Sequence, residues 1–168
     1  MMMRYFSLLI CLFDINQAKI CWKECGSKGV IESTDVIGCK RRSTYPSKQD
    51  FRCEGYKGPP CFVERGDTAL VDVVWNNPGV ANMTQSVTWV TWIEMPWVGL
   101  ETEACPFLDG GQGCRKNANP SKSKYQFPIY VQTMYPTGNF DLKYKFWERL
   151  DSGEEREIAC FLFTMKII

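Results

Sequence analysis

The chain contains no histidine among its 168 residues. That absence excludes the Ser-His-Asp triad, the Cys-His nucleophile, an imidazole ligand for zinc and the side chain whose unperturbed pKa suits general base catalysis near neutral pH. The easiest routes to enzymatic catalysis are therefore closed. Cysteines in the Cys-x-x-Cys spacing of zinc sites are also absent, so the sequence predicts no metal site, and nothing in it indicates a cofactor.

An excess of charge of either sign is missing as well. Lys and Arg total 20 and Asp and Glu total 19, which gives a net charge of +1. Nucleic-acid-binding domains usually carry a basic surplus or stripe, so the balance argues against a nucleic-acid partner. Basic residues gather only in a segment expected to be a loop, residues 40–57, which either contacts an anionic surface or is simply solvated.

No apolar run is long enough to cross a bilayer. The run from Tyr5 to Phe13 follows Arg4 and has the length and composition of a signal-peptide core, with cleavage expected after Ala18. The alternative is a buried strand at the start of a cytosolic fold. The first interpretation makes residues 1–18 a signal peptide and residues 19–168 a single secreted domain.

Secretion has two consequences for the chain. Loss of Cys11 turns nine cysteines into eight, and an even number in an oxidising compartment indicates disulfides, although eight cysteines allow about a hundred connectivities. Asn82-Met-Thr84 is a sequon for N-glycosylation at Asn82, on an expected connection between strands.

Several segments alternate apolar and polar residues, which is the pattern of half-buried antiparallel strands. In residues 140–146 the residues that share one face are Phe140, Leu142, Tyr144 and Phe146. Further strands are predicted at residues 30–37, 69–75, 86–95, 125–131 and 158–167, with a turn at 151–154 and loops at 40–57 and 105–124. No segment has a helical period, so the sequence predicts an all-β sandwich.

Short motifs in a fixed order carry more specific information. They are Lys23-Glu-Cys25-Gly-Ser27, Ile37-Gly-Cys39, Pro60-Cys61 leading through Glu64-Arg-Gly66 into a strand, Met95-Pro-Trp97, the pair Cys105 and Cys114, Tyr135-Pro136, and Cys160 in the last strand. Over residues 23–168 this order resembles the ML lipid-recognition family, most closely its sterol carriers and their arthropod relatives. The resemblance implies an immunoglobulin-like β-sandwich of two antiparallel sheets with an apolar slot for one lipid, and no enzyme.

The resemblance also places a binding site. Trp97 matches the aromatic residue that follows proline at the mouth of the slot, and Val131 and Tyr135 match a valine and a tyrosine beside that mouth. Deeper positions fall on Val71, Val73, Trp75, Trp89, Phe161 and Phe163. The alternating pattern adds Met95, Ile129, Leu142, Tyr144 and Phe146. The alternative for each is an ordinary place in the core.

By the same resemblance the pairs are Cys25 with Cys160, Cys39 with Cys61, and Cys105 with Cys114, which leaves Cys21 to pair with Cys53. These last two are extra to the family pattern, and the loop between Cys39 and Cys61 is longer than usual. Large aromatic residues also replace smaller ones in the slot. The departures leave the identity of the lipid open.

The expected function is transport of one hydrophobic ligand, a sterol or a fatty acid, by a secreted monomer that contacts a membrane or a receptor during transfer. The resemblance adds carriage of semiochemicals and the lysosomal lumen as variants. An innate-immune adaptor that presents microbial lipid to a receptor is the alternative, and it would need an apolar patch or a basic rim at the mouth. A third alternative is a structural sandwich with a filled core.

Overall fold

The computed structural model describes residues 20–26, 30–40, 53, 57–58, 60–77, 79–91, 93–114 and 121–168. The expected signal peptide, residues 1–18, lies outside these ranges. Most of the basic loop at 40–57 does too, apart from Lys40, Cys53 and Lys57. Both therefore stay predictions.

The described chain is built from strands. In order they are β1 (Trp22–Glu24), β2 (Ile31–Ile37), β3 (Cys61–Val63), β4 (Thr68–Asn77), β5 (Thr84–Val90), β6 (Glu94–Pro96), β7 (Ser121–Tyr130), β8 (Gly138–Arg149) and β9 (Glu155–Ile167), with one 3-10 turn, η1 (Cys105–Phe107), before β7. Within the described ranges no helix has the length and apolar character needed to cross a membrane. The predicted all-β class is confirmed.

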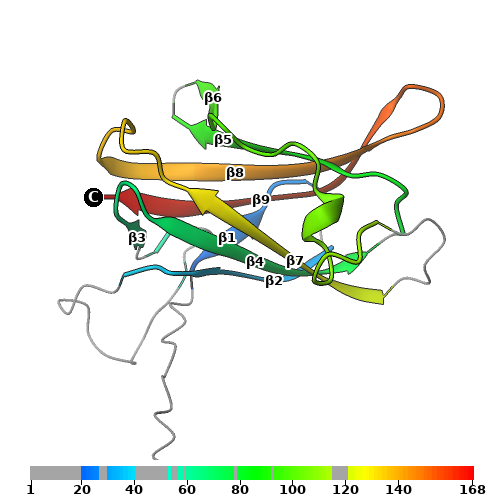
Figure 1. The fold of residues 1–168 in the computed structure, drawn as a ribbon, viewed down its shortest axis with the longest axis horizontal. Helices are drawn as coiled ribbons and strands as arrows, with labels where there is room; N and C mark the ends of the chain where they lie inside the picture. The colour runs from blue at the N-terminus through cyan, green and yellow to red at the C-terminus, as the bar shows by residue number, and fades with distance from the viewer. Residues whose placement is uncertain are drawn as a thin grey trace, which may run out of the picture.

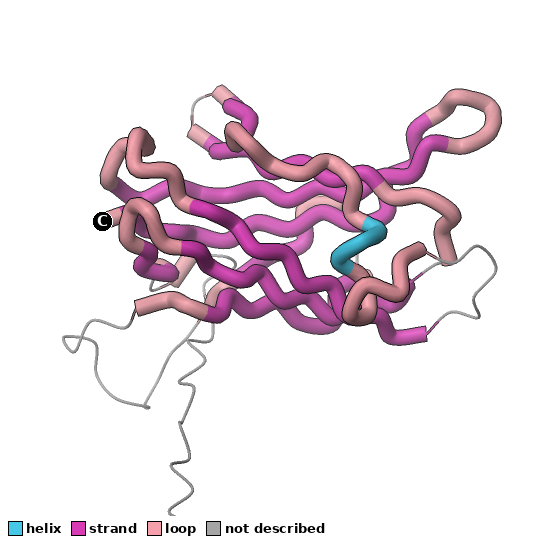
Figure 2. Tube along the Cα trace, in the orientation of Figure 1, coloured by secondary structure: helices cyan, strands magenta, loops and turns pink. Residues whose placement is uncertain are grey.

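Two sheets form a sandwich (Figures 1 and 2). The larger has the strand order β1-β9-β8-β5-β6, with β3 also paired to β9, and the smaller has the order β2-β4-β7. In Figure 1 the strands β2, β4 and β7 lie below β5, β8 and β9. Pairing is antiparallel except between β3 and β9, which run parallel. The sandwich of two sheets is confirmed, with this one parallel pair as an addition.

The centre of the larger sheet follows directly from the alternating sequence. Leu142, Tyr144 and Phe146 on β8 are 0% exposed, as is Phe161 on β9. Tyr144 lies opposite Phe161 in the register. Because successive side chains of a strand point to opposite faces, the intervening lysines lie on the outer face.

Two expected boundaries were wrong. Residues 86–95 do not form one strand, because the chain reverses after Val90 and returns as β6, with Met95 opposite Trp89. The Thr91 hydroxyl donates to the carbonyl oxygen of Ile93 at 2.8 Å and holds this turn. The expected loop at 105–124 contains η1 and the first residues of β7, because Ser121 already pairs with Asn77.

Four disulfides join the expected pairs, three that the resemblance implied and one between the two cysteines left over. They link Cys25 to Cys160, Cys39 to Cys61, Cys105 to Cys114 and Cys21 to Cys53, with sequence separations of 135, 22, 9 and 32. The Cys25 amide also donates to the Cys160 carbonyl oxygen at 2.9 Å, so the longest link ties the end of β1 to β9. A Cβ at Gly26 beside it would lie 3.0 Å from the Cys160 Cβ and closer still to the Glu157 carboxyl group, so a side chain there would require both neighbours to shift.

Candidate lipid-binding site

The residues predicted to line the slot, apart from Met95, all lie buried between the two sheets. The smaller sheet and the chain directly after β7 supply Val71, Val73, Trp75, Ile129 and Val131, and the larger sheet and the loops at its end supply Trp89, Trp97, Tyr135, Leu142, Tyr144, Phe146, Phe161 and Phe163. The structure therefore brings them together from strands far apart in the sequence. Contact with a lipid stays a prediction for each of them.

Met95 is the exception, because its side chain is not buried. Its side chain is 42% exposed, and that of Ile93 is 48% exposed. The prediction assumed one continuous strand through residue 95, on which every second residue would share a face. The reversal after Val90 breaks that continuity and places Met95 on the edge strand β6.

At one end of the sandwich a cluster of rings fills the expected mouth. The centroid of the Trp97 ring lies 4.8 Å from that of Tyr135 and 5.0 Å from that of Trp89. Phe140 meets Trp89 on another side, with 4.6 Å between the centroids. Trp97 is only 5% exposed, so it is buried within this ring cluster.

The Tyr135 hydroxyl has its hydrogen-bond partners within the protein. It donates to the carbonyl oxygen of Val98 at 2.9 Å and accepts from the Val98 amide at 3.2 Å. Gln132 Nε2 donates to the same carbonyl oxygen at 3.2 Å. Side chains of the β7–β8 loop thus hold the residues after β6 across the end of the slot.

Farther in, the two sheets share a second aromatic cluster. Phe146 meets Trp75 edge-on at a centroid distance of 4.8 Å and Tyr125 at 5.0 Å. Tyr144 stacks on Phe161 at 4.9 Å. Aromatic pairs of this kind contribute about 0.5–1.5 kcal/mol beyond the burial of their area. The rings also occupy the space in which a lipid would lie.

The prediction missed several residues of this interior. Tyr125 and Phe127 are buried beside Ile129 on β7. Their spacing of two within the predicted strand could have revealed both. Gln85 is 0% exposed and lies just before the predicted strand at 86–95. As a polar residue it gave no signal in the sequence.

Gln85 is held by two partners. The Tyr125 hydroxyl donates to its Oε1, and its Nε2 donates to the carbonyl oxygen of Glu101 at 2.7 Å. Among the other buried side-chain donors, the Tyr144 hydroxyl, the Trp75 Nε1 and the Thr34 hydroxyl have no hydrogen-bond partner among the described residues. The interior is therefore apolar with a few fixed polar groups.

Charge is nearly absent from this interior. The buried polar or charged residues of the described chain are Thr34, Gln85, Ser123 and Glu148. The Glu148 carboxylate pairs with Arg156 at 2.6 Å. In the part of the chain that the structure describes, no group of three or more histidine, cysteine, aspartate or glutamate residues is placed to hold a metal ion.

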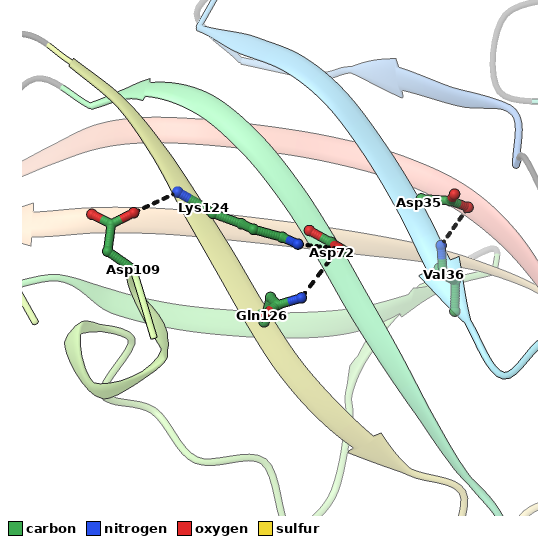
Figure 3. Close-up of polar contacts among 6 residues, drawn as sticks. All are labelled: Asp35, Val36, Asp72, Asp109, Lys124 and Gln126. Atoms are coloured by element: carbon green, nitrogen blue, oxygen red, sulfur yellow. Dashed lines mark hydrogen bonds and ion pairs between the residues drawn. The ribbon is translucent and has the colours of Figure 1, made fainter. Parts of the chain in front are cut away.

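The outer face of the smaller sheet is polar (Figure 3). Asp72 on β4 pairs with Lys124 at 3.0 Å and accepts a hydrogen bond from Gln126 at 3.2 Å, both from β7. Asp109 Oδ1 accepts from the Lys124 amide at 2.7 Å and so attaches the loop that follows η1 to β7. The outer face of this sheet mixes these polar groups with half-buried Leu70 and Val74, whereas the side chains of its inner face are buried, so the candidate site is the space between the sheets.

Two hollows on the described surface lie elsewhere. One is lined by Glu64, Arg65, Thr133 and Ile168. The other is lined by residues near the β8–β9 turn, among them Asn82, Thr102, Trp147 and Glu155. Neither includes a residue predicted for the slot.

The buried tyrosines provide a test by pH. Burial raises the pKa of Tyr144 and of Tyr125 above the usual value. A raised pKa in the folded state stabilises the fold below about pH 10, where the unfolded tyrosine is neutral, and that contribution is lost as the pH rises further. We expect the ultraviolet absorbance of phenolate to increase in two steps, the second together with unfolding followed by circular dichroism. A single step near pH 10 with the fold intact would contradict the burial of these hydroxyls.

Comparison with known proteins decides the family. A family model described as the ML domain matches residues 33–167. The chain belongs to the ML domain family. The fold of this ML domain is similar to the crystal structure of a Niemann-Pick type C2 protein from the Japanese carpenter ant, with a TM-score of 0.60 and 20% identity, over 89% of this chain and 100% of that chain. No curated protein matches the sequence. The ML family binds lipids, which agrees with an apolar space between two sheets.

Proposed function

We propose that this ML domain is a secreted, non-enzymatic carrier that holds one lipid, such as a sterol or a fatty acid, between its two sheets. The observation that supports this function is the continuous apolar and aromatic interior, to which both sheets contribute and in which no lysine or arginine of the described chain is buried. A lipid that hides roughly 500 Å² of apolar surface gains up to about 12 kcal/mol before entropic costs. Burial alone thus provides enough free energy for binding.

The end loops provide the route for entry. Trp97 and Tyr135 close this end of the sandwich, and the side-chain hydrogen bonds between their loops converge on Val98. These side-chain hydrogen bonds are far fewer than the backbone hydrogen bonds that pair β8 with β9. The loops should therefore separate more easily than the strands. Val98 is 60% and Met134 is 79% exposed. These apolar side chains beside the mouth support contact with a membrane or a receptor during transfer.

Mass spectrometry of the lipid that co-purifies with the secreted protein tests the carrier function directly. Displacement of a fluorescent sterol and of a fluorescent fatty acid provides the second measurement. A protein that carries no lipid and displaces neither probe would refute the carrier and favour a purely structural sandwich.

Trp97→Ala should weaken lipid binding by about 1–3 kcal/mol, because it removes an apolar wall at the entrance. Since Trp97 is 5% exposed and packs on Trp89 and Tyr135, the same change should also lower the free energy of unfolding by about 2–3 kcal/mol. Affinity must therefore be measured per folded molecule. Trp147→Ala, at a half-buried tryptophan that lines the other hollow, is the matched control and should leave affinity unchanged. Unchanged affinity in Trp97→Ala would place the mouth elsewhere.

Secretion is part of the proposal. Four disulfides suit an oxidising compartment, extracellular or lysosomal. N-terminal sequencing of the mature protein should find residue 19 first if residues 1–18 are a signal peptide.

Asn82 should carry a glycan when the protein is secreted from eukaryotic cells. Its side chain is exposed, and it contacts only the backbone of Arg149, where Oδ1 accepts from the amide at 3.2 Å and Nδ2 donates to the carbonyl oxygen at 3.5 Å. A glycan would replace one hydrogen on Nδ2 of Asn82, and the hydrogen bond that Oδ1 accepts from the Arg149 amide could remain. Glycosidase treatment should increase gel mobility, and Thr84→Ala should abolish that change. Identical mobility with and without the enzyme would mean that Asn82 is not modified.

A further inference from the structure

The hollow beside the β8–β9 turn lies at the opposite end of the larger sheet from the β7–β8 loop and the C-terminus (Figure 1). Its volume is about 640 Å³, within the range of sites for small ligands, about 300–1,000 Å³. All three residues of the sequon Asn82-Met-Thr84 line it, and so does Trp147. An attachment point for a sugar and an indole ring thus share one hollow.

Trp147 lies on the outer face of the larger sheet. Phe146 before it is 0% exposed in the interior, and successive residues of a strand point to opposite faces. Trp147 is half-buried, and it is not among the partly buried residues of the described chain that pack against the core. In the register of β5 and β8 it lies opposite Thr84. A ligand in the hollow can therefore cover its ring without any change to the interior.

Asn82, two residues before Thr84, extends the pairing of β5 with β8 through its side chain. Its Oδ1 accepts from the Arg149 amide at 3.2 Å, and its Nδ2 donates to the Arg149 carbonyl oxygen at 3.5 Å, as the backbone of a paired strand would. Because Thr84 lies opposite Trp147, Asn82 and Trp147 are diagonal neighbours. Such neighbours lie about 7–8 Å apart, within reach of an aromatic side chain. A sugar on Nδ2 thus begins beside Trp147.

The remaining walls of the hollow are polar. On one side the Gln85 amide donates to the Thr102 carbonyl oxygen at 2.7 Å, and Glu103 pairs with Thr84, so this wall is held by backbone contacts. The side chains of Thr102, Glu103 and Glu155 line the hollow. A hydroxyl and two carboxylates suit the hydroxyl and amide groups at the rim of a sugar. The C–H groups on the face of a sugar ring suit the indole.

We propose that this hollow binds the first N-acetylglucosamine of the glycan on Asn82, with the face of the sugar ring packed on Trp147. The inference rests on the proposed glycosylation of Asn82 and adds a binding site for its glycan. A sugar in this position shields the indole from water, which stabilises the glycosylated form. Since Trp97 and Tyr135 lie at the other end of the sheet, the glycan leaves the proposed route for lipid entry free.

Enzymatic release of the glycan from the folded protein, secreted with high-mannose glycans, tests this contact. Peptide-N-glycosidase cuts between Asn82 and the first sugar, whereas an endoglycosidase cuts after that sugar. Peptide-N-glycosidase should act roughly three- to tenfold faster on Trp147→Ala than on the wild type, the factor for loss of one aromatic contact. The endoglycosidase should cut both at equal rates. Trp147→Phe, which keeps a ring, and Leu162→Ala, at a half-buried residue of the same face outside the hollow, should stay close to the wild type.

Nuclear magnetic resonance of the wild type, with its glycan trimmed to one sugar, tests the contact without a variant. Protons on the face of the sugar should shift upfield in the ring current of Trp147. Signals at the positions of a free N-acetylglucosamine, or equal release by peptide-N-glycosidase from wild type and Trp147→Ala, would overturn the contact and leave the glycosylation standing. An unmodified Asn82 would refute the glycosylation and the contact together, and the carrier function is tested separately by the lipid measurements.

Discussion

Replacing Cys25 and Cys160 together by alanine should lower the free energy of unfolding by about 5 kcal/mol. The link spans a separation of 135 residues, and on the chain-entropy model the stabilisation grows with the length of the closed loop. The effect is comparable with the whole stability of many domains, about 5–15 kcal/mol, so the variant should be largely unfolded near body temperature. Denaturant titration followed by tryptophan fluorescence measures the loss.

The matched control removes the bridge between Cys105 and Cys114 in the same way. Its separation is only 9 residues, so the same model gives about 2.5 kcal/mol. If the two double variants lose equal stability, loop entropy is not the source of the stabilisation, and strain or packing around β1 and β9 must account for it.

Phe161→Ala should cost about 3–5 kcal/mol of unfolding free energy, because it leaves a cavity in the middle of the sandwich. Phe161 is 0% exposed, stacks on Tyr144 at 4.9 Å and lies 6.2 Å from the rings of both Phe146 and Phe163. Backbone pairing fixes it at the centre of the larger sheet, so its neighbours cannot easily close the gap. Thermal and denaturant unfolding give the value.

Leu162→Ala is the control for this variant. Leu162 is the next residue of β9, half-buried on the opposite face, and its loss should cost about 1 kcal/mol. A cost below about 1.5 kcal/mol for Phe161→Ala would show that the sheets move together after the loss. The interior would then be deformable enough to open around a ligand without separate movement of the end loops.

Much of the fold could be predicted from the sequence. The alternation at 140–146 predicted which side chains of β8 face inward, and the same pattern held for β9. The order of the cysteine motifs indicated the family and, through it, three of the disulfides; the fourth, between Cys21 and Cys53, followed because only these two cysteines were left. The strands β1, β3 and β6 span three residues each and were missed, because a period of two is not detectable over so short a run.

The candidate site was predicted less completely. Trp97 and Tyr135 do lie together, as the resemblance implied, but both are buried and the Tyr135 hydroxyl bonds to Val98. Met95 is exposed because the chain reverses before it and leaves it on the edge strand β6. These outcomes depend on loops whose path is set by contacts with the other sheet, and no local pattern encodes them.

The sequence by itself determined the β class, the faces of the long strands and the lack of histidine chemistry, because backbone geometry and composition are local properties. Tertiary structure alone decided that the aromatic side chains fill the space they were expected to line. It also decided that Tyr125 finds Gln85 while Tyr144 and Trp75 find no partner among the described residues. Whether a buried donor is satisfied depends on strands that are distant in the sequence and meet only when the two sheets pack.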